Sequence, residues 1–253
     1  MVLKFLTFGS HNGGIHANYI DAAVRLANQV KELKLFDEII VYTGNNLKED
    51  TEFWNKHGEF ILNNRRGFGY WLWKPYIIKK TMENMNEGDI LLYLDGGCEF
   101  EIEEKEWLEY CIEKVKTDKI VITDTRDQLE NKWNKMDLIE KLNMNDDKYL
   151  NTFQNAATMS MYYICKETRD LVNEWYDLCC DYHNIDDSPS IKKNLETFIE
   201  HRHDQSVFSL LIKKYGIYSD VKLDDNDDKC IKIYRNKNGQ SMLEYYKNKK
   251  QFT

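Results

Sequence analysis

Proline, glycine and long apolar runs are scarce in this sequence. Only two of its 253 residues are proline and 12 are glycine, and no Gly/Ser-rich or repetitive stretch divides the chain. We therefore expect no linker, and the length suits one large domain. No apolar run of about 18 residues predicts a membrane helix, and the N-terminal MVLKFLTFGS is too short for a signal peptide. We expect a soluble, cytoplasmic protein with no membrane segment in this chain, although a catalytic domain cut from a membrane-anchored chain would look the same.

A basic excess is also missing. The chain has 35 Lys and Arg against 43 Asp and Glu, a formal net charge of −8, whereas nucleic-acid binding requires a basic face. The charge balance therefore argues against general nucleic-acid binding. The six cysteines have neither CxxC spacing nor a metal-ligand pattern, which predicts free thiols in a reducing compartment. Hydrophobic residues at 42% and aromatic residues at 13% suffice for a core and exclude a disordered chain.

Strand and helix patterns alternate from the N-terminus onward. Residues 2–8 and 38–43 form apolar strand patterns, and residues 19–35 between them repeat apolar side chains about every 3.6 positions. Strand, helix and strand joined by short turns make a βαβ unit, which implies parallel pairing. Further strands are expected at 60–62, 90–94, 119–123, 158–165 and 231–234, and further helices at 75–85, 104–115, 166–182 and 204–215. This order predicts an α/β fold with a mainly parallel central sheet and flanking helices.

Residues 65–99 (RRGFGYWLWKPYIIKKTMENMNEGDILLYLDGGCE) are the most informative stretch. A loop of glycine, aromatic and basic residues ends at Lys74-Pro75, and a helical spacer leads to the strand 90–94, which ends at Asp95. A buried strand that delivers a carboxylate at its carboxyl end is how open α/β sheets present a group to a ligand. Arg65, Arg66 and Lys74 would suit a pyrophosphate with a base stacked nearby. The stretch predicts a nucleotide or nucleotide-sugar site; the alternative is that the tryptophans are core and the arginines surface.

Asp95 is a candidate contact for a divalent cation or a ribose hydroxyl. Sugar-nucleotide enzymes usually place two acids one residue apart at this point, so that both reach one Mn²⁺ or Mg²⁺. Here the second position is Gly97, and the next acid is Glu99. Asp95 and Glu99 are therefore the candidate metal ligands.

Other polar residues follow predicted strands or precede a predicted helix. The turn Gly9-Ser10-His11-Asn12-Gly13-Gly14 loosely resembles a phosphate loop but has neither the GxGxxG nor the GxxxxGK[ST] spacing, so a plain turn is the alternative. Asp124 follows a strand, and Asn155 lies in a polar patch. In residues 201–205 (HRHDQ), Asp204 is a candidate N-cap, and zinc at the two histidines lacks further ligands.

Taken in order, these pieces resemble a glycosyltransferase of the GT-A fold, similar to retaining enzymes of the glycogenin and bacterial galactosyltransferase kind and to small bacterial or viral glycosyltransferase-like proteins. The matching pieces are a Lys-Pro helix, a strand ending in Tyr93-Leu94-Asp95, an Asn155-Ala156 segment, and Asp204-Gln205 opening a helix. The likeness covers about residues 1–215. It implies one GT-A-like domain over 1–253, with a Rossmann-like nucleotide-binding half (1–124) and an acceptor and sugar half (125–253).

The resemblance also implies roles for residues. Lys74 would bind the donor nucleotide or its phosphates, Asp124 and Asn155 would face the transferred sugar, and Asp204-Gln205 would lie beneath its anomeric carbon. The implied catalytic residues are Asp204, Gln205 and Asp124. The implied donor-binding residues are Gly9, Ser10, Arg66, Lys74, Asp95, Gly96, Asn155 and His203.

Two departures from the family pattern concern the metal. The family's DxD is DGG here, and no histidine follows His203 to match a C-terminal metal-binding histidine. Lys232, Arg235 and Lys237 would then neutralise the diphosphate in place of Mn²⁺ or Mg²⁺. The stereochemistry stays open, because an inverting enzyme needs a general base and Asp124, Asp204 and His203 are all candidates.

Three functions are compatible with this sequence. The first is a glycosyltransferase of polysaccharide biosynthesis that moves a sugar from a nucleotide-sugar donor, most simply a UDP-sugar, to a glycan-type acceptor. The second is a non-catalytic GT-A-like module that binds a nucleotide or a glycan, which the missing DxD acid motivates. The third is a nucleotidyltransferase on a similar sheet, although its glycine-rich N-terminal signature is absent.

Overall fold

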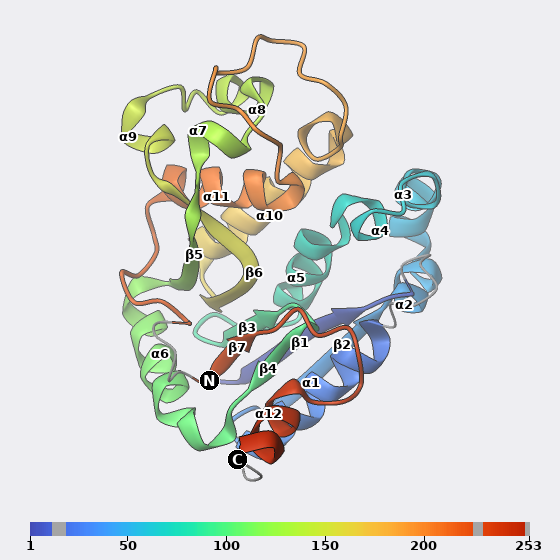
Figure 1. Cartoon of the computed structure of the whole chain (residues 1–253), viewed down its shortest axis with the longest axis vertical. Helices are drawn as coiled ribbons and strands as arrows, with labels where there is room; N and C mark the ends of the chain where they lie inside the picture. The colour runs from blue at the N-terminus through green and yellow to red at the C-terminus, as the bar shows by residue number, and fades with distance from the viewer. Residues whose placement is uncertain (12–18, 225–229, 251–253) are drawn as a thin grey trace.

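The computed structural model describes residues 1–11, 19–224 and 230–250 (Figure 1). Part of the glycine-rich turn expected at residues 9–14 lies outside these ranges. Within them, a five-stranded central sheet lies between two layers of helices, and a separate two-stranded sheet includes the C-terminal strand. Among the described helices, none has the length and hydrophobicity needed to cross a membrane.

The central sheet has the strand order β2-β1-β3-β6-β5. Strand β1 pairs in parallel with both β2 and β3, whereas β6 is antiparallel to both of its neighbours, β3 and β5. Strand β5 therefore points the same way as the first three, and β6 is the one reversed strand of this sheet. The predicted α/β class with a mainly parallel sheet is confirmed. The strands are β1 (Leu3–Gly9), β2 (Glu38–Thr43), β3 (Ile90–Leu94), β5 (Ile120–Leu129) and β6 (Phe153–Tyr163).

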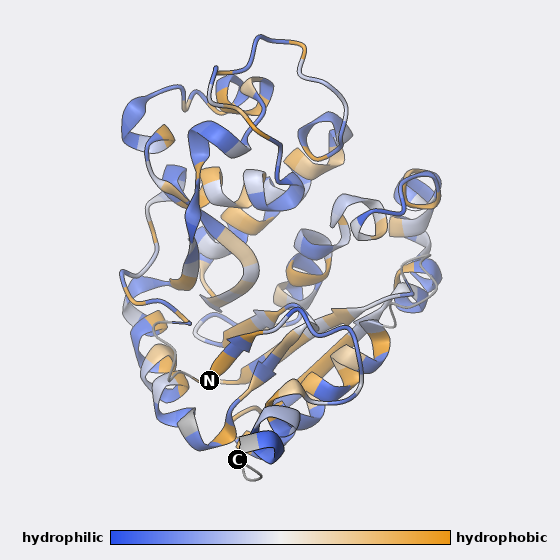
Figure 2. Cartoon of the chain, in the orientation of Figure 1, coloured by the Kyte–Doolittle hydropathy of each residue, from blue (hydrophilic) through white to orange (hydrophobic). Residues whose placement is uncertain are grey.

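Both faces of the sheet are covered, which explains why β3 is a continuous apolar run. Leu91 and Tyr93 pack toward one face, against helices α5, α10 and α11, and the alternate residues of β3 pack toward the other, against α1 and α6. Figure 2 shows hydrophobic residues along the inner strands and a mixture on the surrounding helices. These helices are α1 (Tyr19–Leu33), α5 (Trp73–Glu83), α6 (Lys105–Asp118), α10 (Lys166–Cys180) and α11 (His203–Tyr215).

The remaining helices lie in the connections between these elements or follow β7. Between β2 and α5 the chain forms three of them, and most of the others lie between β5 and β6 or around residues 181–202. They are α2 (Gly44–Glu49), α3 (Thr51–Asn63), α4 (Gly67–Tyr70), η1 (Ile102–Glu104), α7 (Glu130–Trp133), α8 (Met136–Lys141), α9 (Asp147–Leu150), η2 (Tyr182–Asn184) and α12 (Met242–Lys250).

The strand expected at residues 60–62 is wrong. These residues belong to helix α3, whose first turn is capped by the Asp50 carboxylate accepting the Phe53 N–H at 3.2 Å. Phe53, His57 and Ile61 are buried at a spacing of four residues, which is a helical face. The sequence contains both the capping Asp50 and this spacing. The strand was predicted from the short apolar run at residues 60–62 alone.

The two-stranded sheet joins the C-terminal segment to the carboxyl end of β3. Strand β4 (Cys98–Phe100) follows β3 after a turn and pairs antiparallel with β7 (Ile231–Ile233). Residues far apart in the sequence thereby come together beside the end of β3 (Figure 1). Because ligands of open α/β sheets bind at the carboxyl ends of the strands, this is where a site is expected.

Candidate active site

A cleft with a volume of about 460 Å³ lies where β1 and β3 end. It is lined by residues that follow these two strands, by the segment 66–74, by the first turn of α11 and by the C-terminal segment 233–237. Of the residues expected at the site, it brings together Ser10, Arg66, Lys74, Asp95, Gly96, His203, Asp204 and Gln205. The volume is in the range of about 300–1,000 Å³ typical of small-molecule sites.

A buried lysine ties two carboxylates together in this cleft. Lys74 Nζ lies 3.1 Å from Asp95 Oδ1 and 3.3 Å from Asp204 Oδ2, and it donates to the Ala157 carbonyl at 3.0 Å. Lys74 Nζ thus makes one hydrogen bond and two ion pairs. Burial lowers the pKa of Lys74, but the carboxylates of Asp204 and Asp95 outweigh it, so the net pKa is raised and the lysine stays charged.

The two carboxylates have different surroundings. Asp95 is about one third exposed (32%) and accepts the Tyr93 hydroxyl at 2.5 Å, whereas Asp204 is 5% exposed. Burial raises the pKa of Asp204 to about 6, with Lys74 opposing this shift and Asp95 adding to it. A carboxyl group that titrates near neutrality and lines a cleft is typical of a functional site. Asp204 is the second residue of α11, whose N-cap is Arg202 with no side-chain cap, so its predicted capping role is wrong.

Next to this cluster the backbone forms a left-handed helical turn. The five consecutive residues from Gly67 to Trp71 have φ between 51° and 83°. The turn is closed by the bond from the Tyr70 N–H to the Arg66 carbonyl (2.8 Å), and the indole N–H of Trp73 donates to the Gly67 carbonyl (2.9 Å). Left-handed backbone costs about 1–2 kcal/mol per non-glycine residue. Such strain concentrates at functional sites, and here it places Trp71 in the lining of the cleft.

Gly67→Ala should lower the free energy of unfolding by about 3 kcal/mol, from the left-handed φ together with overpacking. A Cβ at this position would lie 2.4 Å from the Trp71 ring. Gly216→Ala is the matched control, because Gly216 has φ of +64° and open space around its missing Cβ. The control should lose about 1 kcal/mol from the backbone alone. Urea denaturation of both variants measures the difference, and equal losses would contradict a tightly packed turn.

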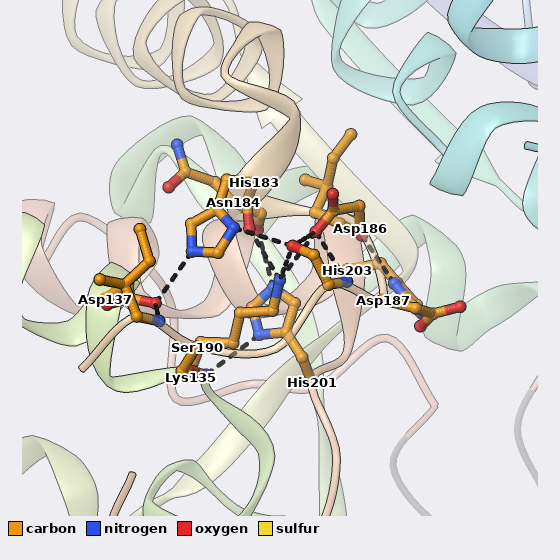
Figure 3. A network of polar contacts seen from close by, with 12 residues as sticks. Lys135, Asp137, His183, Asn184, Asp186, Asp187, Ser190, His201 and His203 are labelled. Atoms are coloured by element: carbon orange, nitrogen blue, oxygen red, sulfur yellow. Dashed lines mark hydrogen bonds and ion pairs between the residues drawn. The ribbon is translucent and has the colours of Figure 1, made fainter. Parts of the chain in front are cut away.

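A polar network holds the segment that leads into α11 (Figure 3). Lys135 Nζ donates to the His183 carbonyl (2.9 Å) and to Asp186 (2.8 Å), and the Lys135 N–H donates to Nδ1 of His201 (3.2 Å). The other nitrogen of His201 donates to the Asn184 carbonyl at 2.7 Å. With both nitrogens bonded, burial lowers the pKa of His201 to about 3. His201 is therefore a neutral structural residue, and zinc at the two histidines does not fit.

His203 is the first residue of α11 and lines the cleft in a left-handed conformation with φ of 54°. Its Nδ1 donates to the Ile185 carbonyl at 2.7 Å, and its ring stacks on those of Tyr70 and Trp71 at centroid distances of 5.0 and 5.3 Å. Burial lowers the pKa of His203. The ring thus connects the left-handed turn to the start of α11, next to Asp204.

The expected metal pair does not converge. Glu99 is fully buried and accepts from Ser241 Oγ (2.5 Å), Asn236 Nδ2 (2.7 Å) and the Met242 N–H (2.9 Å). Asp95 is engaged by Lys74 and Tyr93. Over the part of the chain that the structure describes, no three His, Cys, Asp or Glu side chains cluster closely enough to hold a metal ion. These donors do not fit Mn²⁺ or Mg²⁺, because Glu99 is used to hold the C-terminal segment.

Three further expected residues are not part of the cleft lining. Asp124 and Asn155 face each other across β5 and β6, and Asp124 lies 3.7 Å from Lys222 Nζ. Close packing explains the glycine at position 9, because a Cβ there would lie 2.3 Å from the Tyr19 carbonyl oxygen at the start of α1. The roles that the resemblance implied for these three residues remain predictions.

Several lining residues were missed as site residues. Trp71 belonged to the aromatic loop predicted to stack on a base, with a core position as the alternative, but it was not named as a site residue. Arg202 and Gln128 were not assigned a role. Gln205 Nε2 donates to Gln128 Oε1 at 3.0 Å, so these two amides form one group beside Asp204. The pair of glycines flanking Phe68 indicated an unusual backbone at the turn, but nothing in the sequence indicated that Gln128 would reach α11.

Comparison with protein-family models and with curated proteins finds no match for this sequence. Among solved structures, the chain is similar to mouse xyloside xylosyltransferase 1 (10% identity, 87% of this chain and 84% of that chain covered, TM-score 0.41). It is also similar to the galactosyltransferase LgtC (15% identity, 85% and 72% covered, TM-score 0.45). A third is a putative glucose-1-phosphate thymidylyltransferase from Bacillus anthracis (10% identity, 86% and 85% covered, TM-score 0.38). At these identities and TM-scores the likeness carries no argument about function, which has to be argued from the cleft.

Proposed function

We propose that this chain is a glycosyltransferase that moves a sugar from a nucleotide-sugar donor, a UDP-sugar in the first instance, to a glycan-type acceptor. The observation that carries the proposal is the ion-pair cluster of buried Lys74 and Asp204 with the partly exposed Asp95 in a cleft at the strand ends. Further cationic side chains also line this cleft: Arg66, Arg202, Arg235 and Lys237. Carboxylates that can bind sugar hydroxyls, next to cations that can bind phosphates, match the two parts of such a donor.

The transfer breaks the bond between the anomeric carbon and the diphosphate oxygen, and the diphosphate leaves with the bonding electrons. The acceptor hydroxyl oxygen forms the new bond and gives up its proton to the leaving diphosphate. Asp95, being partly exposed, is suited to bind hydroxyl groups of the donor. Asp204 and Gln205 present a carboxylate and an amide that would stabilise positive charge on the sugar ring, and the cationic side chains would stabilise the leaving diphosphate. We assign the reaction to cytoplasmic polysaccharide biosynthesis.

The test of this function is binding of UDP, GDP, CMP and dTDP by titration calorimetry, followed by release of nucleotide from the matching nucleotide-sugar. We expect UDP to bind with a Kd between about 1 μM and 1 mM, the usual range of substrate KM values, and UDP-sugars to be turned over. Binding of none of the four nucleotides would contradict the proposal.

The two alternatives give different results in the same assays. A non-catalytic module would bind a nucleotide or glycan without release of nucleotide from any nucleotide-sugar. A nucleotidyltransferase would release pyrophosphate from a nucleoside triphosphate when a sugar 1-phosphate is supplied.

A further inference from the structure

The C-terminal segment covers Gly97, the position at which sugar-nucleotide enzymes usually have a second acid after Asp95. A Cβ on Gly97 would lie 3.0 Å from the Arg235 Cα and 3.2 Å from its carbonyl carbon. The Asn236 N–H also donates to the Gly97 carbonyl at 3.0 Å. These neighbours are backbone atoms, so an aspartate at position 97 would have to push this backbone away by a few tenths of an ångström. The backbone of residues 235 and 236 therefore occupies the space into which a metal-binding side chain at position 97 would project.

Two buried charged residues fix this segment to the end of β3. Glu99 accepts from the Asn236 side chain, from Ser241 and from the Met242 and Leu243 N–H groups at the start of α12. Arg25, which is 7% exposed, donates to the carbonyls of Gly96 and Cys98, both at 3.0 Å, and to the Asn238 carbonyl. Figure 1 shows the segment running from β7 to α12, beside α1. Its position is thus set by bonds to the same turn that carries Asp95.

The held segment presents two cations to the cleft. Arg235 and Lys237 are both exposed and both line the cleft, together with Ser10 and Gly96. No carboxylate among the described residues forms an ion pair with either of them, and Lys237 Nζ lies 5.9 Å from the Tyr19 ring centroid. Lys74, by contrast, is fully engaged by its carboxylates. A guanidinium matches two phosphate oxygens at once, and an ammonium adds a point charge.

We propose that Arg235 and Lys237 bind the diphosphate of the donor in place of a divalent cation, and that Glu99 and Arg25 are positioning residues that hold them there. The proposal rests on the proposed function, which supplies the diphosphate. It assigns to Glu99 a role opposite to the expected one, since its carboxylate holds the cationic segment and does not bind the ion.

The test is calorimetric titration of the full chain with UDP and with inorganic pyrophosphate, each in EDTA and in Mn²⁺. We expect the wild-type protein to bind both probes with the same Kd, within about threefold, in the two conditions. Arg235→Gln combined with Lys237→Gln should weaken binding by about tenfold or more, the effect of losing charge-assisted hydrogen bonds. Arg235→Lys alone should weaken binding less than the double variant does, because it keeps the charge but loses the second hydrogen bond to the phosphate.

The control is Lys249→Gln, which removes one charge from the same C-terminal segment. Lys249 lies on α12 outside the cleft lining, with its Nζ 5.7 Å from the Tyr245 ring centroid, so binding should not change. Binding that requires Mn²⁺, or a double variant that binds as the wild type does, would overturn the inference and leave the proposed function standing. Binding of neither probe in either condition would overturn the inference, and if GDP, CMP and dTDP also fail to bind, the proposed function is overturned as well.

Discussion

A Lys74→Met variant should lose about 3–5 kcal/mol of unfolding free energy, because removing one partner of a buried ion pair leaves the other charge uncompensated. It should also lose about 10²–10³-fold in transfer activity, the usual effect of removing one preorganised electrostatic group. Lys74 is 3% exposed and is the one cation that contacts both Asp95 and Asp204 among the described residues. Without it, Asp204 would take up a proton and Asp95 would lose its fixed orientation.

The measurements are urea denaturation and nucleotide release from the preferred donor. Lys80→Met is the matched control, since Lys80 lies on the same helix and is paired with Asp50 outside the cleft lining. Its side chain is 39% exposed, so the loss of this pair should cost no more than about 1 kcal/mol and leave activity unchanged. Equal stability losses in the two variants, with activity kept in both, would contradict the central position of Lys74.

The local part of the site was predictable from the sequence. The strand 90–94 and its terminal Asp95 follow from an apolar run that stops at an acid and two glycines. The helix that begins near Lys74-Pro75 was also predictable, because proline fits the first turn of a helix. These conclusions need only neighbours in the chain, and that is why they hold.

The contacts that give these residues their properties were not predictable. Lys74 and Asp204 are 130 positions apart, and nothing near either one indicates that they form an ion pair. Glu99 was assigned to a metal because it is the acid nearest Asp95, whereas its partners come from residues 236–243. Tyr70 and Trp71 adopt a left-handed backbone that their residue types disfavour. In each case the tertiary structure, and not the local sequence, decides the role.

Asp204→Asn should lower activity by about 10²–10³-fold and remove a pH dependence that the wild type shows near pH 6. Burial raises the pKa of Asp204 to about 6 from the ordinary value of 3.8. The carboxylate that we propose to face the sugar therefore predominates only above pH 6, so wild-type kcat/KM should fall as the pH drops through this value. The profile of the Asn variant should be flat there, because an amide does not titrate.

Stability should change in the opposite direction over the same range. The native Asp204 binds its proton more tightly than the unfolded chain does, so its favourable contribution is complete below pH 4 and is lost as the pH rises through about 6. Activity gained and stability lost between pH 4 and pH 6.5 would identify one buried group as the source of both. Asp118→Asn is the control: Asp118 accepts from Ser219 at 2.5 Å outside the cleft lining, and its loss should leave the activity profile unchanged. A wild-type profile without a transition near pH 6 would rule out Asp204 as the group that acts on the sugar.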